Sequence, residues 1–359
     1  MRALVAMVTL VACGSSSKDA PPAPPSVAAP PVSPASPVAA SSTTVRIDRR
    51  VELLSFVNAL AGFKEYTLGQ TNPYRTAFVS YFRPFAGHAA VQHAKRLRAE
   101  KGIGYDAPMI LAVHLDDNLQ LVNAAELPQL DRRWDGVDAE AYAADLRAFA
   151  ADTKLDEFLV KHADHYRKIE ATLRDAVDAE KPSAWYDALL GARDKARFTV
   201  IPGPMTGTYN FGVRATRADG TLDLYQILAV DTPTGLPVVN DDLVFLLVHE
   251  TGHSYVNPVL AQHEAALAAP ARKLFAKVED RMRKQAYPTW QIFLAEQVVR
   301  AATFAYFGDK KGSAATALLL DQEHERGFLW TAEIAGLLRE RGKDYVAHLP
   351  LLLEQLGQR

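Results

Sequence analysis

Two histidines and a glutamate stand close together in the segment His249-Glu250-Thr251-Gly252-His253. The histidines are four residues apart, so on a helix both imidazoles project from one face and can bind one metal ion. This pattern is typical of zinc, which binds histidine nitrogen at about 2.0–2.1 Å. Glu250 lies about 100° around such a helix from His249, where its carboxylate can take a proton from a zinc-activated water. The pattern therefore indicates metal-assisted hydrolysis.

The surrounding sequence predicts the helix that carries this motif. Asn240 or Asp241 can cap its first turn, and the apolar run 243–248 leads directly into the motif. Asn257 and Pro258 are expected to end it. The alternative is a chance match on a solvated helix face. The apolar run argues against that alternative because it predicts burial, and buried imidazoles need partners such as a metal ion.

A catalytic zinc site needs a third protein ligand and an open position. The metzincin pattern is excluded because Val256 and Val259 occupy the places of its glycine and its histidine. A glutamate about 19 residues past His253, as in thermolysin-like sites, is excluded because Arg272 stands there and its neighbours are not acidic. The third ligand must come from farther along the chain.

Glu296 is the strongest candidate because it is the lone acid in the apolar stretch 290–307. Arg300 follows one helical turn later and can hold the carboxylate in place. The alternative is a buried Glu296–Arg300 ion pair without a metal. His263 and Glu264, just after the predicted helix break, are the other ligand candidates.

Hydrolysis also needs a donor that stabilises the negative charge of the transition state. Tyr209, in the glycine-flanked segment TGTYNFG, can serve if its strand lies beside the motif helix, where that strand can also align an extended peptide. Tyr306 and His324 are alternatives. Each of the three also fits an ordinary core or surface position.

Two weaker clusters carry other interpretations. His162, Asp164 and His165 have metal-like spacing, but their charged surroundings favour a solvated helix face. A second cluster can line a cleft or cap a helix, and it comprises Glu323, Glu325 and Arg326.

The N-terminus has the features of an export signal. Arg2 precedes an apolar run at 3–12, and residues 10–13 read LVAC, which resembles the bacterial lipobox. The resemblance implies cleavage after residue 12 and lipidation of Cys13, and Gly14, in place of an aspartate, favours the outer membrane. An ordinary cleaved signal is the alternative, and both export the protein. Cys13 is the only cysteine, so no intramolecular disulfide can form.

Residues 13–44 are expected to be a tether rich in Pro, Ala and Ser, extending roughly 3 Å per residue. Beyond it we predict an α+β, predominantly helical fold. It has a mainly helical part at 45–195 and a zincin-like catalytic part at 196–359, in which a small, mostly antiparallel sheet lies beside the motif helix. The helices before the sheet are predicted at 46–63, 76–82, 88–101, 140–152 and 155–178, and short strands at 109–115 and 118–122.

Composition is that of a globular protein, with 359 residues, 48% hydrophobic and 23% charged. A formal net charge of -2 supplies no broad attraction to nucleic acid, so no nucleic-acid partner is expected.

The segments HETGHSYVNP, EQVVRA, VELLSFVNALAGFKEY and YFRPFAGHAAV resemble an uncharacterised bacterial family of HExxH proteins, a domain of unknown function. The similarity runs from about Arg46 to the C-terminal helices. It implies a gluzincin-like site of His249, His253 and Glu296, with Glu250 as base. The family supplies no substrate.

Together these observations lead us to expect an exported, lipid-anchored zinc metallopeptidase that acts on peptides or proteins at the cell envelope. A zinc-binding or scaffold lipoprotein without turnover, or a zinc amidase acting on cell-wall peptides, are the alternatives. The sequence predicts no oligomeric state.

Overall fold

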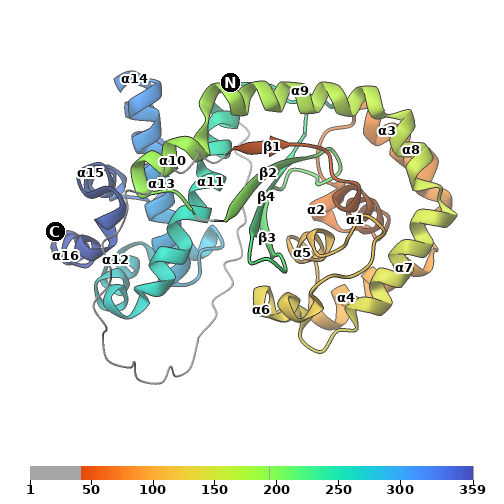
Figure 1. Ribbon diagram of the computed structural model, residues 1–359. Coiled ribbons are helices and arrows are strands. Elements are labelled where there is room, and N and C mark those ends of the chain that lie inside the picture. Colours follow the sequence, from red (N-terminus) through yellow and green to blue (C-terminus); the bar gives the residue numbers. More distant parts are fainter. Residues whose placement is uncertain (1–41, 194, 359) are drawn as a thin grey trace, which may run out of the picture.

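The computed structural model describes residues 42–193 and 195–358. The predicted signal peptide and Cys13 lie outside the described residues. Two groups of helices flank a four-stranded sheet, and a long helix, α9 (Ala163–Glu180), crosses from one group to the other (Figure 1). We call the helices before α9 the N-terminal lobe and those after it the C-terminal lobe. The α+β, predominantly helical class predicted from the sequence is confirmed.

The N-terminal lobe confirms most of the predicted helices. The predicted helix 155–178 is divided at His162, where the backbone leaves helical geometry between α8 and α9. The helices of this lobe are α1 (Arg49–Leu60), α2 (Lys64–Thr67), α3 (Pro73–Phe82), α4 (Ala89–Lys101), α5 (Ala107–Val113), α6 (Leu127–Leu130), α7 (Ala139–Asp152) and α8 (Leu155–Lys161).

The strand predicted at 109–115 is wrong, because this segment forms the helix α5. Every residue of α5 is buried, and an unbroken apolar run has no period that separates a strand from a helix. Pro108 in the first turn favours the helix because that position needs no N–H. In place of the predicted pair of strands, the structure has a single bridge between Leu115 and Leu121.

The sheet contains β1 (Thr43–Val45), β2 (Ala196–Gly203), β3 (Phe211–Thr216) and β4 (Leu222–Ala229), in the order β1-β2-β4-β3. β1 and β4 both run parallel to β2, and only β3 is antiparallel to its neighbour. The prediction of a mostly antiparallel sheet is therefore wrong. β4 lies between β2 and β3 and is buried on both faces, as central parallel strands are, whereas β3 alternates buried and exposed residues. β1 begins at Thr43, inside the segment 13–44 that was predicted to be a tether; the rest of that segment, up to residue 41, lies outside the described residues.

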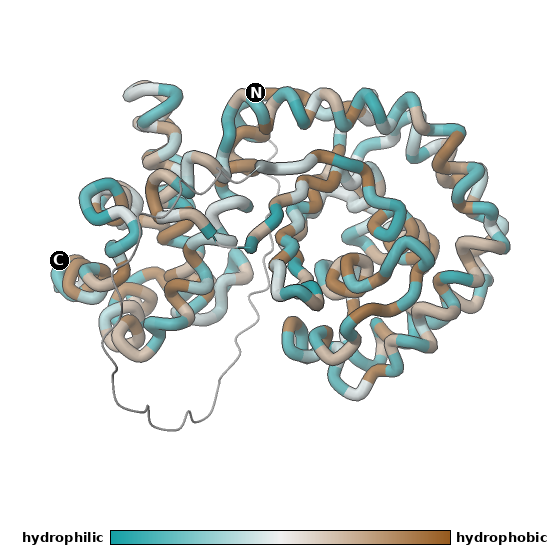
Figure 2. The backbone as a smooth tube through the Cα atoms, in the orientation of Figure 1, coloured by the Kyte–Doolittle hydropathy of each residue, from teal (hydrophilic) through white to brown (hydrophobic). Residues whose placement is uncertain are grey.

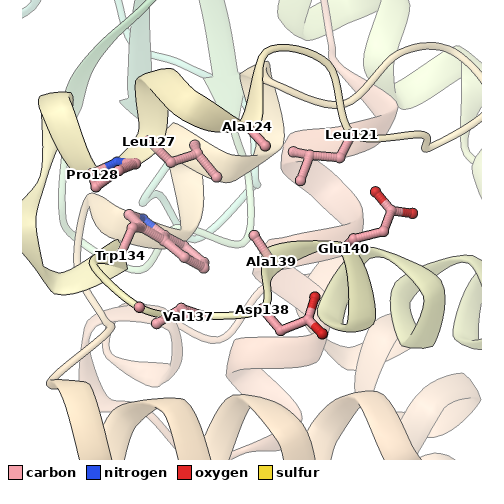
Figure 3. Close-up of a pocket in the computed structure, with 10 residues that line it drawn as sticks. Leu121, Ala124, Leu127, Pro128, Trp134, Val137, Asp138, Ala139 and Glu140 are labelled. Carbon is pink, nitrogen blue, oxygen red and sulfur yellow. The ribbon is translucent and has the colours of Figure 1, made fainter.

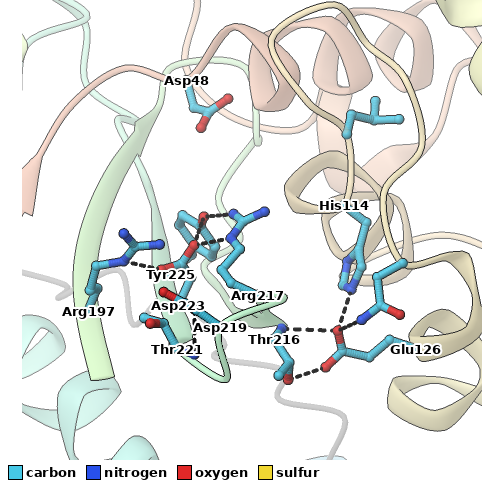
Figure 4. Close-up of polar contacts among 12 residues, drawn as sticks. Asp48, His114, Glu126, Arg197, Thr216, Arg217, Asp219, Thr221, Asp223 and Tyr225 are labelled. Carbon is cyan, nitrogen blue, oxygen red and sulfur yellow. Dashed lines mark hydrogen bonds and ion pairs between the residues drawn. The ribbon is translucent and has the colours of Figure 1, made fainter. Parts of the chain in front are cut away.

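Polar contacts fasten the β3–β4 hairpin to the N-terminal lobe (Figure 4). Glu126 accepts hydrogen bonds from the Thr216 backbone N–H at 3.0 Å and from its hydroxyl at 2.6 Å. Glu126 Oε2 also lies 3.1 Å from Nε2 of the buried His114. At the other strand, Asp223 accepts from Arg197 at 2.6 Å and from Arg217. Glu126 therefore joins the end of β3 to the N-terminal lobe, and Asp223 joins β4 to β2 and to the β3–β4 turn.

Apolar packing divides the structure along the sheet. One face, with Phe211, Val213 and Ile227, packs on the N-terminal lobe, while Phe198 and Leu224 on the other face pack on the C-terminal lobe. Helix α9 alternates polar and apolar segments (Figure 2) and places its buried side against β1, β2 and β4.

The motif helix is α11 (Asp241–Gln262), and Asn240 caps it by accepting a hydrogen bond from the Leu243 N–H at 3.0 Å, as predicted. The prediction that Pro258 ends this helix is wrong. Proline cannot donate to the carbonyl four residues earlier, which belongs to Ser254. Arg193 supplies the missing donor, because its Nη1 bonds that carbonyl, and the helix continues.

The C-terminal lobe surrounds α13, which packs against α11, α12, α14 and α15. Within the described parts of the chain, no helix combines the length and apolar character needed to cross a membrane. Besides α11, the helices of this lobe are α10 (Pro182–Leu190), α12 (Glu264–Lys284), α13 (Trp290–Lys310), α14 (Ser313–Arg326), α15 (Thr331–Arg341) and α16 (Tyr345–Gly357).

Candidate metal centre

His249 and His253 on α11 converge with Glu296 on α13, so the packing of these two helices assembles the group. The two Nε2 atoms are 3.1 Å apart. Glu296 Oε1 lies 3.4 Å from His249 Nε2, and Glu296 Oε2 lies 3.5 Å from His253 Nε2. These three residues could hold a metal ion.

These separations, with a different Glu296 oxygen facing each histidine, are close to those of ligand atoms that share one ion. Tetrahedral ligands at about 2.0–2.1 Å from a zinc ion stand about 3.3 Å from one another. The ring planes of His249 and His253 are inclined at 86° to each other, and their Nε2 atoms are in contact. Two histidines and a carboxylate are also the donor types that zinc accepts.

The protonation of His253 suits a ligand. Nδ1 lies 3.3 Å from the side-chain oxygen of Asn257, which accepts a hydrogen bond and so favours the proton on Nδ1 and a free electron pair on Nε2. Burial, together with the neighbouring His249, lowers the pKa of His253 to about 4. The imidazole is therefore neutral at pH 7, which is the form that binds metals.

Glu296 is held as a carboxylate. Arg300 donates to Oε1 from Nε at 2.8 Å, and its Nη2 forms an ion pair with the same oxygen at 2.7 Å. The Tyr287 hydroxyl also donates to this oxygen, at 3.2 Å. Burial on its own raises the pKa of Glu296, but the charge of Arg300 and the contact with His249 outweigh it and hold the pKa well below its usual range. Arg300 also donates to Glu323 at 2.8 Å, so it lies between two buried carboxylates.

Glu250 lies beside this group but outside it. Its side chain is 4% exposed, and Oε1 has no hydrogen-bond partner among the described residues. Burial raises the pKa of Glu250 to about 7, with the negative charge of Glu296 adding to the effect and His249 opposing it. A buried carboxyl with a free oxygen next to a metal-binding group is the arrangement expected of a general base.

Neighbouring elements fix the orientation of α11. Gly252 is required because a Cβ there would lie 2.3 Å from the Tyr186 hydroxyl of α10. Gln226 of β4 donates to the Thr251 hydroxyl at 2.7 Å. Contacts from α10 and β4 therefore set which residues of α11 face α13.

The structure does not bring the predicted transition-state donors to this group. Tyr209 packs against Tyr105 on the N-terminal side of the sheet, with ring centroids 5.7 Å apart. Tyr306 donates to Glu180 at 2.6 Å. His324 is exposed on α14.

The alternative ligands also lie apart from the group. His263 is exposed, and its Nδ1 lies 2.9 Å from the Val259 carbonyl. Glu264 is exposed and accepts a hydrogen bond from Gln291 at 3.0 Å.

The weaker clusters have structural roles. His162 and His165 are half-buried against the ring of Tyr74 and so are less solvated than expected, while Asp164 is exposed and pairs with Arg167. In the second cluster, Glu323 is buried and accepts from Arg300 and, at 2.7 Å, from Arg326, and Glu325 is exposed.

The sequence did not identify two residues that contact the metal-binding group, Asn257 and Tyr287. Asn257 carries a signal, since it follows His253 by four residues and so shares its helix face. Tyr287 has no such signal in the sequence. It lies before the start of α13, and the turn that leads into this helix brings it to Glu296.

A pocket in the N-terminal lobe, about 330 Å³ in volume, is lined by Leu127 and Trp134 (Figure 3). Its acidic residues have structural partners, since Asp138 caps α7 and Glu140 accepts from Arg147. It shares no residue with the metal-binding group, so we assign it no chemistry.

Comparisons with known proteins agree with the sequence resemblance. No curated protein and no solved structure matches the chain. One family model, described as "Domain of unknown function (DUF4932)", matches residues 43–346. Both α11 and α13 lie inside the matched range. The chain therefore belongs to the DUF4932 family.

Proposed function

We propose that this protein is a zinc-dependent metallopeptidase. The observation that carries the proposal is the buried convergence of His249, His253 and Glu296, with the partnerless carboxyl oxygen of Glu250 beside it. Three protein ligands of these types are the set that catalytic zinc sites use, since they leave a position for water. The resemblance to gluzincins and a zincin-like core are part of this proposal.

The roles of the residues follow from their contacts. His249, His253 and Glu296 hold the ion, and Arg300 keeps Glu296 ionised and oriented. Zinc supplies Lewis acidity, which lowers the pKa of a coordinated water to about 7 and polarises a carbonyl. Glu250 takes a proton from water and passes it to the leaving amine, so the carboxyl needs access to both protonation states. Its raised pKa agrees with that role.

A peptide substrate is favoured by strand β3. In the described part of the chain no strand pairs with the outer edge of β3, and the adjacent strand β4 contacts α11. A sheet edge without a strand partner binds extended peptides through backbone hydrogen bonds, and on this edge Glu126 already accepts the N–H of Thr216, at the end of β3. The proposed location is the cell envelope, with the lipid of Cys13 as anchor.

A zinc-binding lipoprotein without turnover is the second candidate. It is favoured by one observation, since Tyr209, Tyr306 and His324 all lie away from the metal-binding group. Catalysis without such a donor loses a factor of about 10²–10³.

The test combines metal analysis with a peptide library. We expect about one zinc per chain by mass spectrometry, and peptide cleavage that a chelator abolishes. Glu250→Gln should retain zinc and lose at least about 10²-fold in rate, while Glu325→Gln, an exposed control, keeps both. Zinc binding without cleavage of any peptide would favour the second candidate, and cleavage of purified peptidoglycan alone would favour the amidase. Full activity in Glu250→Gln would refute the mechanism.

A further inference from the structure

Arg75 of α3 is a buried arginine with two free hydrogen-bond donors. The residue is 9% exposed, and its Nε and Nη2 are both buried without a hydrogen-bond partner in residues 42–193 and 195–358. The remaining nitrogen, Nη1, donates to the Thr67 carbonyl at 3.4 Å. In a planar guanidinium the Nε–H and one Nη2–H point in parallel from the same edge. The two free donors of Arg75 therefore act together.

Two other arginines of the N-terminal lobe show what this edge of a guanidinium binds. In Arg49, Nε and Nη2 donate to the two carboxylate oxygens of Asp156 at 2.7 and 3.1 Å. In Arg50, the same two nitrogens donate to the two oxygens of Asp48 at 2.8 and 2.6 Å. Such bidentate pairs combine charge with a fixed geometry and are among the strong hydrogen bonds. Arg75 has the same edge, but none of the described carboxylates bonds it.

Two segments of the chain meet at Arg75, residues 67–72 and residues 231–235. Asn72 joins them, because its side-chain oxygen accepts from the Arg75 backbone N–H at 2.9 Å and its Nδ2 donates to the Thr232 carbonyl at 3.2 Å. The first segment is exposed along its whole length before Asn72. A single surface segment therefore covers the guanidinium, and both segments belong to the described residues.

The space beside Gly69 separates Arg75 from an acid, Asp231. Gly69 has a φ of +118°, and a Cβ there would lie 3.4 Å from Arg75 Nη2 and 2.6 Å from Asp231 Oδ1. That oxygen accepts the Gln70 N–H at 2.6 Å, while Nη2 has no partner. Burial lowers the pKa of Arg75, and the charges of Asp231 and Glu52 offset only part of this effect. A further negative group at the free edge would stabilise the guanidinium.

We propose that the Nε–Nη2 edge of Arg75 binds a small carboxylate ligand, at a site separate from the metal centre. A carboxylate presents two oxygens to this edge, as Asp48 and Asp156 do in the neighbouring pairs. A carboxylate is favoured over phosphate because it carries one negative charge, and Asp231 repels a dianion more strongly. The ligand joins the N-terminal lobe to the segment that leads from β4 into α11. This inference is independent of the proposed metallopeptidase.

NMR of the guanidinium Nε–H groups tests the site, because the Arg75 signal reports on this edge even where acetate also binds zinc. The full-length ¹⁵N-labelled protein is titrated with acetate at an ionic strength kept constant with chloride, and the signal is assigned by its loss in Arg75→Lys. We expect a saturable shift with a dissociation constant on the order of 1–10 mM, from two charge-assisted hydrogen bonds. Acetamide, the neutral counterpart, should give no saturable shift. Tighter binding of phosphate than of acetate would overturn the carboxylate assignment.

Variants are compared through the backbone amide signals of Gly69 and Gln70. Arg75→Lys keeps the positive charge but loses the paired edge, so acetate should bind at least about tenfold more weakly. Asp231→Asn can still accept from Gln70 and removes a repelling charge, so acetate should bind about threefold more tightly. Asp175→Asn makes the same charge change on the exposed side of α9 and should have no effect. No saturable shift with acetate, an equal response to acetamide, or unchanged affinity in Arg75→Lys would overturn the inference.

Discussion

Two buried glutamates, one in each lobe, have pKa values that are shifted in opposite directions. Glu52 of α1 accepts hydrogen bonds from the hydroxyls of Tyr74 and Tyr166, and burial raises its pKa to about 7. Glu296 of α13 is buried as fully, but its pKa lies well below the usual range because Arg300 bonds it directly. The nature of the partner therefore decides the charge of a buried carboxyl, since burial is the same for both.

This difference in partners distinguishes Glu52, whose contacts are structural, from Glu296, which could bind a metal ion. Burial destabilises an ionised Glu52 more than its two hydroxyl partners and the charge of Arg75 stabilise it, so its pKa lies above the usual range. Glu296 has a fixed cation on one side and two histidines on the other. Only a carboxyl that is already ionised can bind a metal without first losing a proton.

We expect the largest effect, a loss of unfolding free energy, when the cation of Arg300 is removed. Arg300→Met leaves the buried Glu296 without its cation and Glu323 with Arg326 alone, and breaking such a buried pair costs about 3–5 kcal/mol. Urea unfolding of the metal-free protein at pH 6 measures it. Arg75→Met is the matched control in the other lobe, because two of the buried guanidinium nitrogens of Arg75 have no partner among the described residues. Arg75→Met should lower the free energy of unfolding by under about 1 kcal/mol. Equal losses in Arg75→Met and Arg300→Met would contradict the comparison of the two glutamates.

Zinc should stabilise the folded protein through only one of the two glutamates. At a free zinc concentration of about 100 times the dissociation constant, the gain in unfolding free energy is about 2.7 kcal/mol. Glu296→Gln should abolish this gain and reduce the zinc content measured by mass spectrometry. Glu52→Gln should keep both, and a similar loss of zinc there would show that the effect is not specific to the metal centre.

Glu52 should also shape the pH dependence of stability. Its pKa rises from 4.5 to about 7 on folding, so between these values the folded state binds more protons than the unfolded state. The contribution of Glu52 to the free energy of unfolding is therefore fully present below about pH 4.5 and falls as pH rises toward 7, by roughly 3 kcal/mol over the window. Glu52→Gln should flatten this part of the curve in denaturant titrations of metal-free protein. An unchanged slope would show that Glu52 is already ionised in the fold.

The pH dependence that Glu296 gives to stability has the opposite sign. Its folded pKa is lowered, so its contribution to stability is present above the unfolded pKa and is lost as pH falls further. In Glu52→Gln, the remaining pH dependence should therefore be mainly a loss of stability on the acid side.

The group that could hold a metal ion was predictable because the interactions that place its residues are local or compositional. The four-residue spacing of His249 and His253 fixes their common face, and Glu296 is conspicuous as the lone acid of an apolar helix. Helix periodicity also predicted most of the N-terminal lobe. The sequence did not predict the strand order, because β4 inserts between β2 and β3 through contacts that leave no periodic pattern. The continuation of α11 past Pro258 depends on Arg193, which is distant in sequence.

The smallest expected effect concerns the tyrosines that bond each glutamate, which only the fold brings into place. Tyr166 lies 3.1 Å from Glu52, and Tyr287 lies 3.2 Å from Glu296. Replacing either with Phe removes one hydrogen bond and should cost about 1 kcal/mol of unfolding free energy. Tyr287→Phe should also weaken zinc binding by at least about tenfold, because partners that orient a ligand contribute to metal affinity, whereas Tyr166→Phe should leave it unchanged. Competition with a chelating dye measures both affinities. If the two variants bind zinc equally well, Tyr287 packs against Glu296 without orienting it, and Arg300 alone prepares that carboxylate for the metal.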